Sequence, residues 1–142
     1  MKENFDIAFE FTIGAEGIYS NDPTDSGGET KYGVSKRSHP NIDIKNLTLH
    51  DAKMIAYQEY WDVAGCNELP YPVDIMMFDF AYNAGVNTAK KKWQESSNDK
   101  WEFLLERITY YIRVVKANPI QRKFFYGWIT RVIDLFIKVD VD

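Results

Sequence analysis

The chain has 142 residues and a formal net charge of −4 at pH 7, and 45% of its residues are hydrophobic, with 15% aromatic. This length suits one domain with a real core, and the composition is typical of a globular protein. The overall acidity argues against nonspecific nucleic-acid binding, and no run of eighteen apolar residues predicts a membrane-spanning helix. We therefore expect neither a nucleic-acid partner nor an integral membrane segment.

The charges are divided unevenly along the chain. Residues 1–87 contain 6 Lys or Arg against 14 Asp or Glu, and residues 88–142 contain 11 against 7, so the two parts carry −8 and +4. We predict a single domain over residues 1–142 with two lobes that meet at this boundary. The basic lobe can attract an anionic polymer, or its charges can form an ordinary solvated helix face.

Cysteine and histidine are scarce. Cys66 is the single cysteine, so no internal disulfide can form, and we interpret it as a small apolar core residue. His39 and His50 are the two histidines, and His39 precedes a proline, which favours a surface or capping role. We expect no metal site and no cofactor.

The first predicted helix covers residues 4–15, with Asn4 as its N-cap and Gly17 ending it. Glu16 follows Thr12 by four residues, so its side chain lies on the buried face at the last turn. The negative end of the helix dipole and an apolar neighbourhood both favour a protonated carboxyl, which a general acid requires. The alternative is a solvated Glu beside a C-capping glycine.

The segment 19–33 is rich in turn-forming residues, so it must turn at least twice and leaves room for short strands only at its edges. It can fold back from the helix end and place Asp22, Asp25 or Glu29 opposite Glu16 across a groove. Two carboxyl groups that face one groove are typical of a glycosidase.

The remaining predicted elements are helical, after a short turn at 36–38 that Ser35 caps. The expected helices cover residues 48–64, 73–84, 88–94, 99–117 and 120–137. The helix over 73–84 is almost continuously apolar and should be the central buried helix, and the last two should form an antiparallel hairpin with a loose tail after residue 138. Thr48, Thr88 and Asp99 should open the helices that they precede or begin. The expected apolar stripe of the helix over 48–64 consists of Leu49, Ala52, Ile55, Ala56, Tyr60 and Val63, and that of the helix over 99–117 consists of Trp101, Leu104, Leu105, Ile108, Ile112 and Val115. We predict an all-α fold with a small loop or β-hairpin excursion after the first helix.

Some polar and aromatic side chains have two interpretations. Asp79 and Asn83 lie four residues apart on one helix face, where they can contact sugar hydroxyls or form hydrogen bonds with the ends of neighbouring helices. We favour a structural role for Asp79 and give Asn83 both roles. Aromatic residues at helical spacing are mostly core residues, but Tyr19 and Tyr32 flank the proposed catalytic loop and are candidates for sugar contacts.

The segment Glu16-Gly17-Ile18-Tyr19-Ser20-Asn21-Asp22-Pro23, with the Asp25, Gly27, Gly28, Thr30, Tyr32-Gly33-Val34 and Ser35 that follow, resembles the signature of glycoside hydrolase family 108. That family comprises N-acetylmuramidases, often phage or prophage endolysins, with a lysozyme-like helical fold and a catalytic Glu in a Glu-Gly-Gly-Tyr motif. Here Ile18 replaces the second glycine. The resemblance continues through Tyr60-Trp61, Phe78-Asp79-Phe80, Asn83, Gly85, Gly127-Trp128 and Arg131.

The resemblance implies roles for individual residues. Glu16 matches the catalytic acid, and the region 88–142 would be a helical, peptidoglycan-contacting part. Phage-type lysozymes are similar more distantly. They carry a Glu, then eight residues, an Asp, then five residues and a Thr. Eight residues likewise separate Glu16 from Asp25 here, but only four separate Asp25 from Thr30. In those lysozymes the Asp and Thr position a water. Asp22 competes with Asp25 for this role, and Tyr19, Asp22, Tyr32 and Asn83 are the expected substrate-binding residues.

The function implied by the resemblance is a lysozyme that cleaves the β-1,4 bond between N-acetylmuramic acid and N-acetylglucosamine in peptidoglycan. Its rivals are a lytic transglycosylase, a noncatalytic wall-binding or secretion-associated protein, and a chitin-directed enzyme. The charged start of the chain and Glu10 argue against a signal peptide. We therefore expect a monomer made in the bacterial cytoplasm, which acts on the cell wall after release through a separate holin or export partner.

Overall fold

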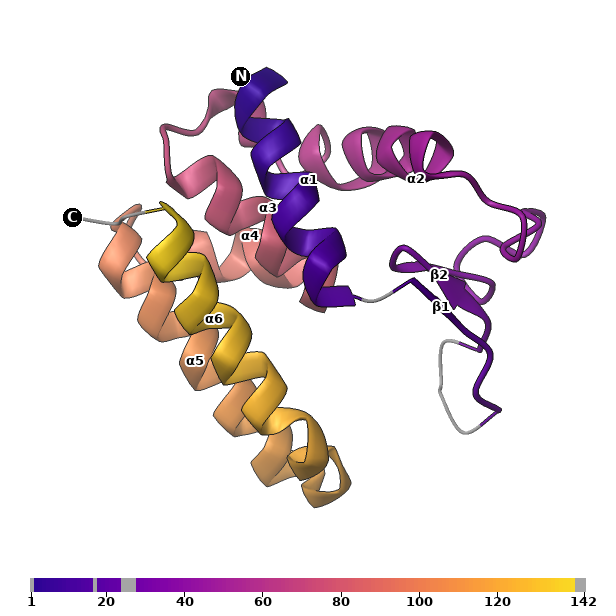
Figure 1. Cartoon of the computed structure of the whole chain (residues 1–142). Helices are drawn as coiled ribbons and strands as arrows, with labels where there is room; N and C mark the ends of the chain where they lie inside the picture. The colour runs from indigo at the N-terminus through magenta and orange to yellow at the C-terminus, as the bar shows by residue number, and fades with distance from the viewer. Residues whose placement is uncertain (1, 17, 24–27, 140–142) are drawn as a thin grey trace.

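The computed structural model describes residues 2–16, 18–23 and 28–139. Within these ranges helices dominate, and a small sheet follows the first helix (Figure 1). The helices and strands are α1 (Lys2–Glu16), β1 (Tyr19–Ser20), β2 (Thr30–Lys31), β3 (Val34–Ser35), α2 (Leu49–Ala56), α3 (Val73–Ala84), α4 (Val86–Glu95), α5 (Lys100–Ala117) and α6 (Phe125–Val139). The predicted all-α fold with a small excursion after the first helix is confirmed. No helix in these ranges is both long and apolar enough to cross a bilayer.

Helix α3 is the centre of the molecule, as its apolar sequence predicts. Its residues from Val73 to Tyr82 are all buried, and α1 and α4 pack directly against it. An aromatic cluster joins these layers, because the ring of Phe5 on α1 lies 5.7 Å from Phe78 and 5.4 Å from Trp61. Burial of such rings is the main favourable contribution to this core.

The helix after residue 48 begins as expected but changes its geometry. Thr48 is the N-cap, and its hydroxyl accepts a hydrogen bond from the backbone N–H of Asp51 at 3.1 Å. After Ala56 the chain continues as a π-helix, Tyr57–Trp61, whose wider turn shifts the side-chain register. Leu49 and Val63 were expected on the buried stripe, and both are exposed. The wider turn accounts for Val63, and Leu49 lies at the solvent-facing first turn.

Three helix starts differ from the prediction. Helix α1 begins at Lys2, so Asn4 lies inside it and is not its N-cap. Helix α4 begins at Val86 directly after Gly85, whose φ of +98° turns the chain between α3 and α4, so Thr88 is not its cap. The last helix is preceded by a 3-10 helix, Pro119–Phe124, in place of an α-helical turn from residue 120. Asp99 does cap α5, because its carboxylate accepts from two backbone N–H groups of the first turn at 2.9 Å.

Helices α5 and α6 form the predicted antiparallel hairpin (Figure 1). Its buried side is not the predicted one, because Phe103, Arg107 and Tyr111 face the core. Three of the six residues expected on the buried stripe, Trp101, Leu105 and Ile112, are exposed instead, and the other three, Leu104, Ile108 and Val115, are half-buried. The chain near its end is also held more firmly than expected, since Val139 is buried and its carbonyl accepts a hydrogen bond from Tyr71.

Candidate functional site

The sheet after α1 is formed by the segment that the sequence marks as catalytic. Its strands are two residues long and lie in the order β1-β2-β3, with both pairs antiparallel. Thr30 is on the central strand, where it pairs with Ser20 on one side and Ser35 on the other. A third strand was not predicted, because two-residue strands carry no alternation of apolar and polar residues.

Glu16 is the last residue of α1, directly before the sheet (Figure 1). Its side chain and all of Asp25 lie outside the described part of the structure. Thr12 is one helical turn before Glu16 on the same face, is fully buried, and donates its hydroxyl to Asp79 Oδ1 at 2.9 Å. The last turn of α1 is therefore fixed to the central helix at the level of Thr12.

Tyr19 and Glu29 form a contact across the sheet. The hydroxyl of Tyr19 donates to Glu29 Oε2 at 2.7 Å, and this hydrogen bond raises the pKa of Tyr19. Asp22 lies just beyond β1 and is exposed. The strand segment thus presents two described carboxylates, Asp22 and Glu29, and the position of Glu29 is fixed by an aromatic neighbour.

Tyr32 joins the sheet to the helical body. Its φ is +51°, its backbone N–H donates to the carbonyl of Ile18 at 2.9 Å, and its own carbonyl accepts from the hydroxyl of Tyr82 at 2.6 Å. A Cβ on the neighbouring Gly33 would lie 2.3 Å from the Tyr82 ring, and Gly33 has a φ of +79°. Tyr82 on α3 therefore anchors the sheet, and only glycine fits beside it.

A buried ionic cluster lies behind the end of α1. The carboxylate of Asp79 is fully buried and binds two guanidinium groups: Arg107 Nη2 lies 2.7 Å from Oδ2, and Arg131 Nη2 lies 2.9 Å from Oδ1. Burial raises the pKa of Asp79, but the two cations and their hydrogen bonds outweigh burial and hold that pKa below its usual value. The structural role predicted for Asp79 is confirmed: with Thr12 it ties α1, α3, α5 and α6 together.

Asn83 lies at the edge of this cluster. Tyr111 donates its hydroxyl to Asn83 Oδ1, and Arg107 Nε donates to the same hydroxyl at 3.0 Å. Asn83 also lines a surface hollow of about 560 Å³ whose other lining residues are on or near α6. These are Lys123, Phe124, Tyr126, Gly127, Trp128, Thr130, Arg131 and Asp134. Asn83 therefore accepts a hydrogen bond from Tyr111 on α5 and also lines a surface hollow.

The other titratable groups give no sign of a metal centre. Among the described residues, no group of three or more His, Cys, Asp or Glu side chains converges on one point. Cys66 is buried, and this burial raises the pKa of its thiol. His39 Nε2 pairs with Glu59 Oε2 at 2.6 Å, and its side chain is 12% exposed, so it is more buried than the surface role expected for it.

Residues 9–85 match the family model described as glycosyl hydrolase 108, and this range is more than half of the chain. The chain belongs to glycosyl hydrolase family 108. It is therefore a glycoside hydrolase, and the resemblance inferred from the Glu16 segment is confirmed at the level of the family. The matched range of this family 108 chain contains Glu16, Asp25, Thr30 and Asn83 and ends before Arg107 and Arg131.

A solved structure supports the fold over the full length. The structure of Brucella abortus SagA superimposes on the family 108 chain with a TM-score of 0.81, covering 100% of this chain and 98% of SagA. The two sequences are 22% identical, so this likeness shows a common fold. No curated protein is similar enough in sequence to give a significant match.

Sequence reasoning missed two parts of the site in this family 108 enzyme. The sequence places Tyr82 on the central helix. It does not show that the Tyr82 hydroxyl donates a hydrogen bond to the backbone carbonyl of Tyr32. Arg107 lies on a helix whose apolar residues suggested another buried face. A useful signal was present, because Arg107 and Tyr111 are four residues apart and share one helix face with Phe103.

Proposed function

We propose that this family 108 enzyme hydrolyses the β-1,4 bond between N-acetylmuramic acid and N-acetylglucosamine in peptidoglycan, with Glu16 as the general acid. The observation that carries the proposal is the place of Glu16 at the end of α1. It lies one turn beyond Thr12, which is locked to Asp79, and directly before the sheet that carries Thr30. A general acid needs this kind of fixed support.

In the proposed mechanism, protonated Glu16 donates its proton to the leaving glycosidic oxygen as positive charge builds on the sugar ring. Asp25, or Asp22 in its place, acts with Thr30 to orient water or to stabilise the oxocarbenium-like state. A separation of about 5 Å between the two carboxyl groups would suit a retaining reaction, and about 6.5 to 9.5 Å would suit inversion.

The glycan strand is proposed to lie between the sheet and the α6 side of the molecule. Tyr19 and Tyr32 would contact it from the sheet, and Asn83 would contact it from the hollow beside α6. The exposed, rigid aromatic ring of Tyr19 and the amide of Asn83 are suited to sugar faces and hydroxyls. The basic region 88–142 would add attraction for an anionic wall polymer.

Ile18, which replaces the motif's second glycine, is compatible with the sheet that follows α1. Its carbonyl accepts the hydrogen bond from Tyr32, and its side chain is 69% exposed, so it points away from the packed interior. This arrangement supports an enzyme over a noncatalytic wall-binding protein. We further propose that the enzyme acts as a monomer on the cell wall after release from the cytoplasm through a separate holin or export partner.

Mass spectrometry of digested peptidoglycan tests the proposal. We expect reducing muramic ends from the native enzyme and about 100-fold fewer or none from Glu16→Gln, because loss of a general acid costs at least this factor. Glu10→Gln is the matched control, since Glu10 is an exposed carboxylate on the same helix. Anhydromuramic ends would reassign the enzyme as a lytic transglycosylase, and a folded native protein that releases nothing would refute the proposal.

Variants of the second group complete the assignment. Asp25→Asn, Asp22→Asn and Thr30→Ala are compared in the same digestion, with Glu29→Gln as a further carboxylate on the sheet. Among these single variants, Thr30→Ala and one of the pair Asp25→Asn and Asp22→Asn should lower the yield of muramic ends most. If none of them lowers the yield, the reaction does not use a second carboxylate, as in a transglycosylase.

A further inference from the structure

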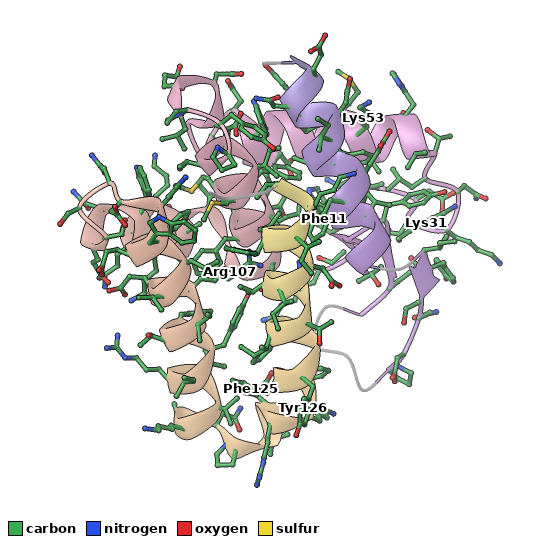
Figure 2. The ribbon with its side chains drawn as sticks, turned by 60° about the vertical axis from the view of Figure 1, so that its left-hand side comes forward. Phe11, Lys31, Lys53, Arg107, Phe125 and Tyr126 are labelled. Carbon is green, nitrogen blue, oxygen red and sulfur yellow. The ribbon has the colours of Figure 1, made fainter. Side chains whose placement is uncertain are left out.

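The closed end of the α5–α6 hairpin carries an unusual combination of exposed side chains. Ile120 is 74% exposed, Tyr126 is 85% exposed and Ile112 is 39% exposed. Figure 2 shows Phe125 and Tyr126 at this end of the hairpin, with Lys53 at the opposite end of the view. We call the exposed surface of Ile112, Arg113, Val115, Lys116, Ile120, Arg122, Lys123, Phe124 and Tyr126 the hairpin tip.

The apolar surface extends from the hairpin tip along the outside of the hairpin. On α6, Tyr126, Ile133 and Ile137 are spaced by seven and four residues, so they share one face, and all three are exposed. Leu105 on α5 is 57% exposed. The opposite face of the hairpin is packed on the core, so this outer face has no partner among the described residues.

Basic residues dominate the sequence around the hairpin tip, although Asp134 lines the hollow beside Asn83 together with Lys123 and Tyr126. Between residues 107 and 133 the chain has six Lys or Arg residues and no Asp or Glu, although the whole chain has a net charge of −4. Arg107 and Arg131 are neutralised by Asp79. The other four cations, Arg113, Lys116, Arg122 and Lys123, are exposed at the hairpin tip.

Apolar and basic groups meet in one hollow at the hairpin tip. This hollow has a volume of about 420 Å³ and is lined by Ile112, Val115, Lys116, Arg122, Phe125 and Tyr126. Aliphatic and aromatic side chains thus lie beside two cations. Such a surface matches the boundary between lipid headgroups and acyl chains, where aromatic rings and Lys or Arg side chains are both favoured.

We propose that the hairpin tip binds the surface of an anionic phospholipid bilayer. Its exposed apolar side chains enter the headgroup region, and its four cations pair with lipid phosphates. A second copy of the chain is a poorer partner, because a twofold contact through this tip would bring the four cations of each copy together, and residues 107–133 supply no acid to offset their repulsion. Lys123, Phe124 and Tyr126 also line the hollow beside Asn83, so the proposal is tested through Ile112, Lys116, Ile120 and Arg122, which do not line it.

Vesicle flotation tests the proposal, with phosphatidylcholine vesicles that contain or lack phosphatidylglycerol. We expect the native protein to float with the anionic vesicles only, and less so as salt is added. Lys116→Gln with Arg122→Gln should weaken binding about 25-fold, at about fivefold per cation. Ile112→Ser with Ile120→Ser should abolish it. The controls are Lys90→Gln with Lys91→Gln on α4 and Val63→Ser, which remove the same kinds of exposed group elsewhere.

Thermal melting of each variant shows whether it is folded, and exposed substitutions of this kind should leave the midpoint unchanged. Three results would overturn the proposal: no flotation of the native protein, equal flotation with neutral vesicles, or equal effects of tip and control variants. Two further results would overturn it by showing another occupant: a tip-dependent dimer in analytical ultracentrifugation, or binding to purified wall polymer without binding to lipid.

Discussion

Replacement of Asp79 by Asn should destabilise the enzyme severely. The carboxylate has no exposure to solvent and receives hydrogen bonds from Thr12, Arg107 and Arg131 at 2.7 to 3.2 Å. An Asn side chain keeps the shape but removes the charge, and it sets an N–H donor where an acceptor is required. Arg107 and Arg131, exposed by 3% and 8%, would remain buried without their counter-ion.

The magnitude follows from this loss of a buried ion pair. Removal of one partner from such a pair typically costs about 3 to 5 kcal/mol, because a buried charge is left uncompensated. Small domains are stable by only about 5 to 15 kcal/mol. The Asp79→Asn variant should therefore lose a large share of the free energy of unfolding. As the control, Asp134→Asn on the exposed face of α6 should change the free energy of unfolding by less than about 0.5 kcal/mol.

Urea denaturation followed by tryptophan fluorescence measures both changes. The pH dependence gives a second check, because the folded-state pKa of Asp79 lies below that of the unfolded chain. The stability difference between native and variant should be complete above about pH 4 and should shrink as the pH falls through the folded-state pKa. A loss below about 1 kcal/mol at neutral pH, or a difference that grows on acidification, would refute this reasoning.

Two further predictions concern other parts of the structure. Gly33→Ala should lower the free energy of unfolding by about 1 to 3 kcal/mol, because φ is +79° and the new Cβ would meet the Tyr82 ring. In Gly14→Ala on α1 the new Cβ meets nothing within 4 Å, so this variant should be more stable by up to about 1 kcal/mol. Equal urea midpoints for the two would contradict this. The thiol of Cys66 should react with a disulfide reagent far more slowly in the folded protein than in urea, because burial hides it and raises its pKa. Equal rates would show that Cys66 is accessible.

The sequence predicts the elements whose evidence is local. The continuous apolar run of α3 marks the central helix, and Thr48 and Asp99 mark helix starts by their capping chemistry. The position of Glu16 at the end of α1 also follows from helix periodicity and the turn residues after it. These features depend on neighbours a few residues away, so the sequence contains what is needed to infer them.

Other features depend on partners distant in the sequence and could not be predicted. Periodicity on α5 shows that Trp101, Leu105 and Ile112 share a face but not which face meets the core. The answer is decided by Asp79, since its buried charge requires Arg107 on the inner side. Likewise, the bond between Tyr82 and the backbone of Tyr32 joins residues fifty positions apart and leaves no local pattern.

The cluster around Asp79 has a consequence for how the enzyme is made. Thr12 precedes Asp79 by 67 residues, whereas Arg107 and Arg131 follow it by 28 and 52. A ribosome that has just completed the family-matched segment 9–85 has supplied the acid and the hydroxyl but neither cation. The emerging chain cannot bury α3 at low cost until α6 has left the exit tunnel. The cluster that fixes the helix carrying Glu16 is thus completed only after α6 has been synthesised.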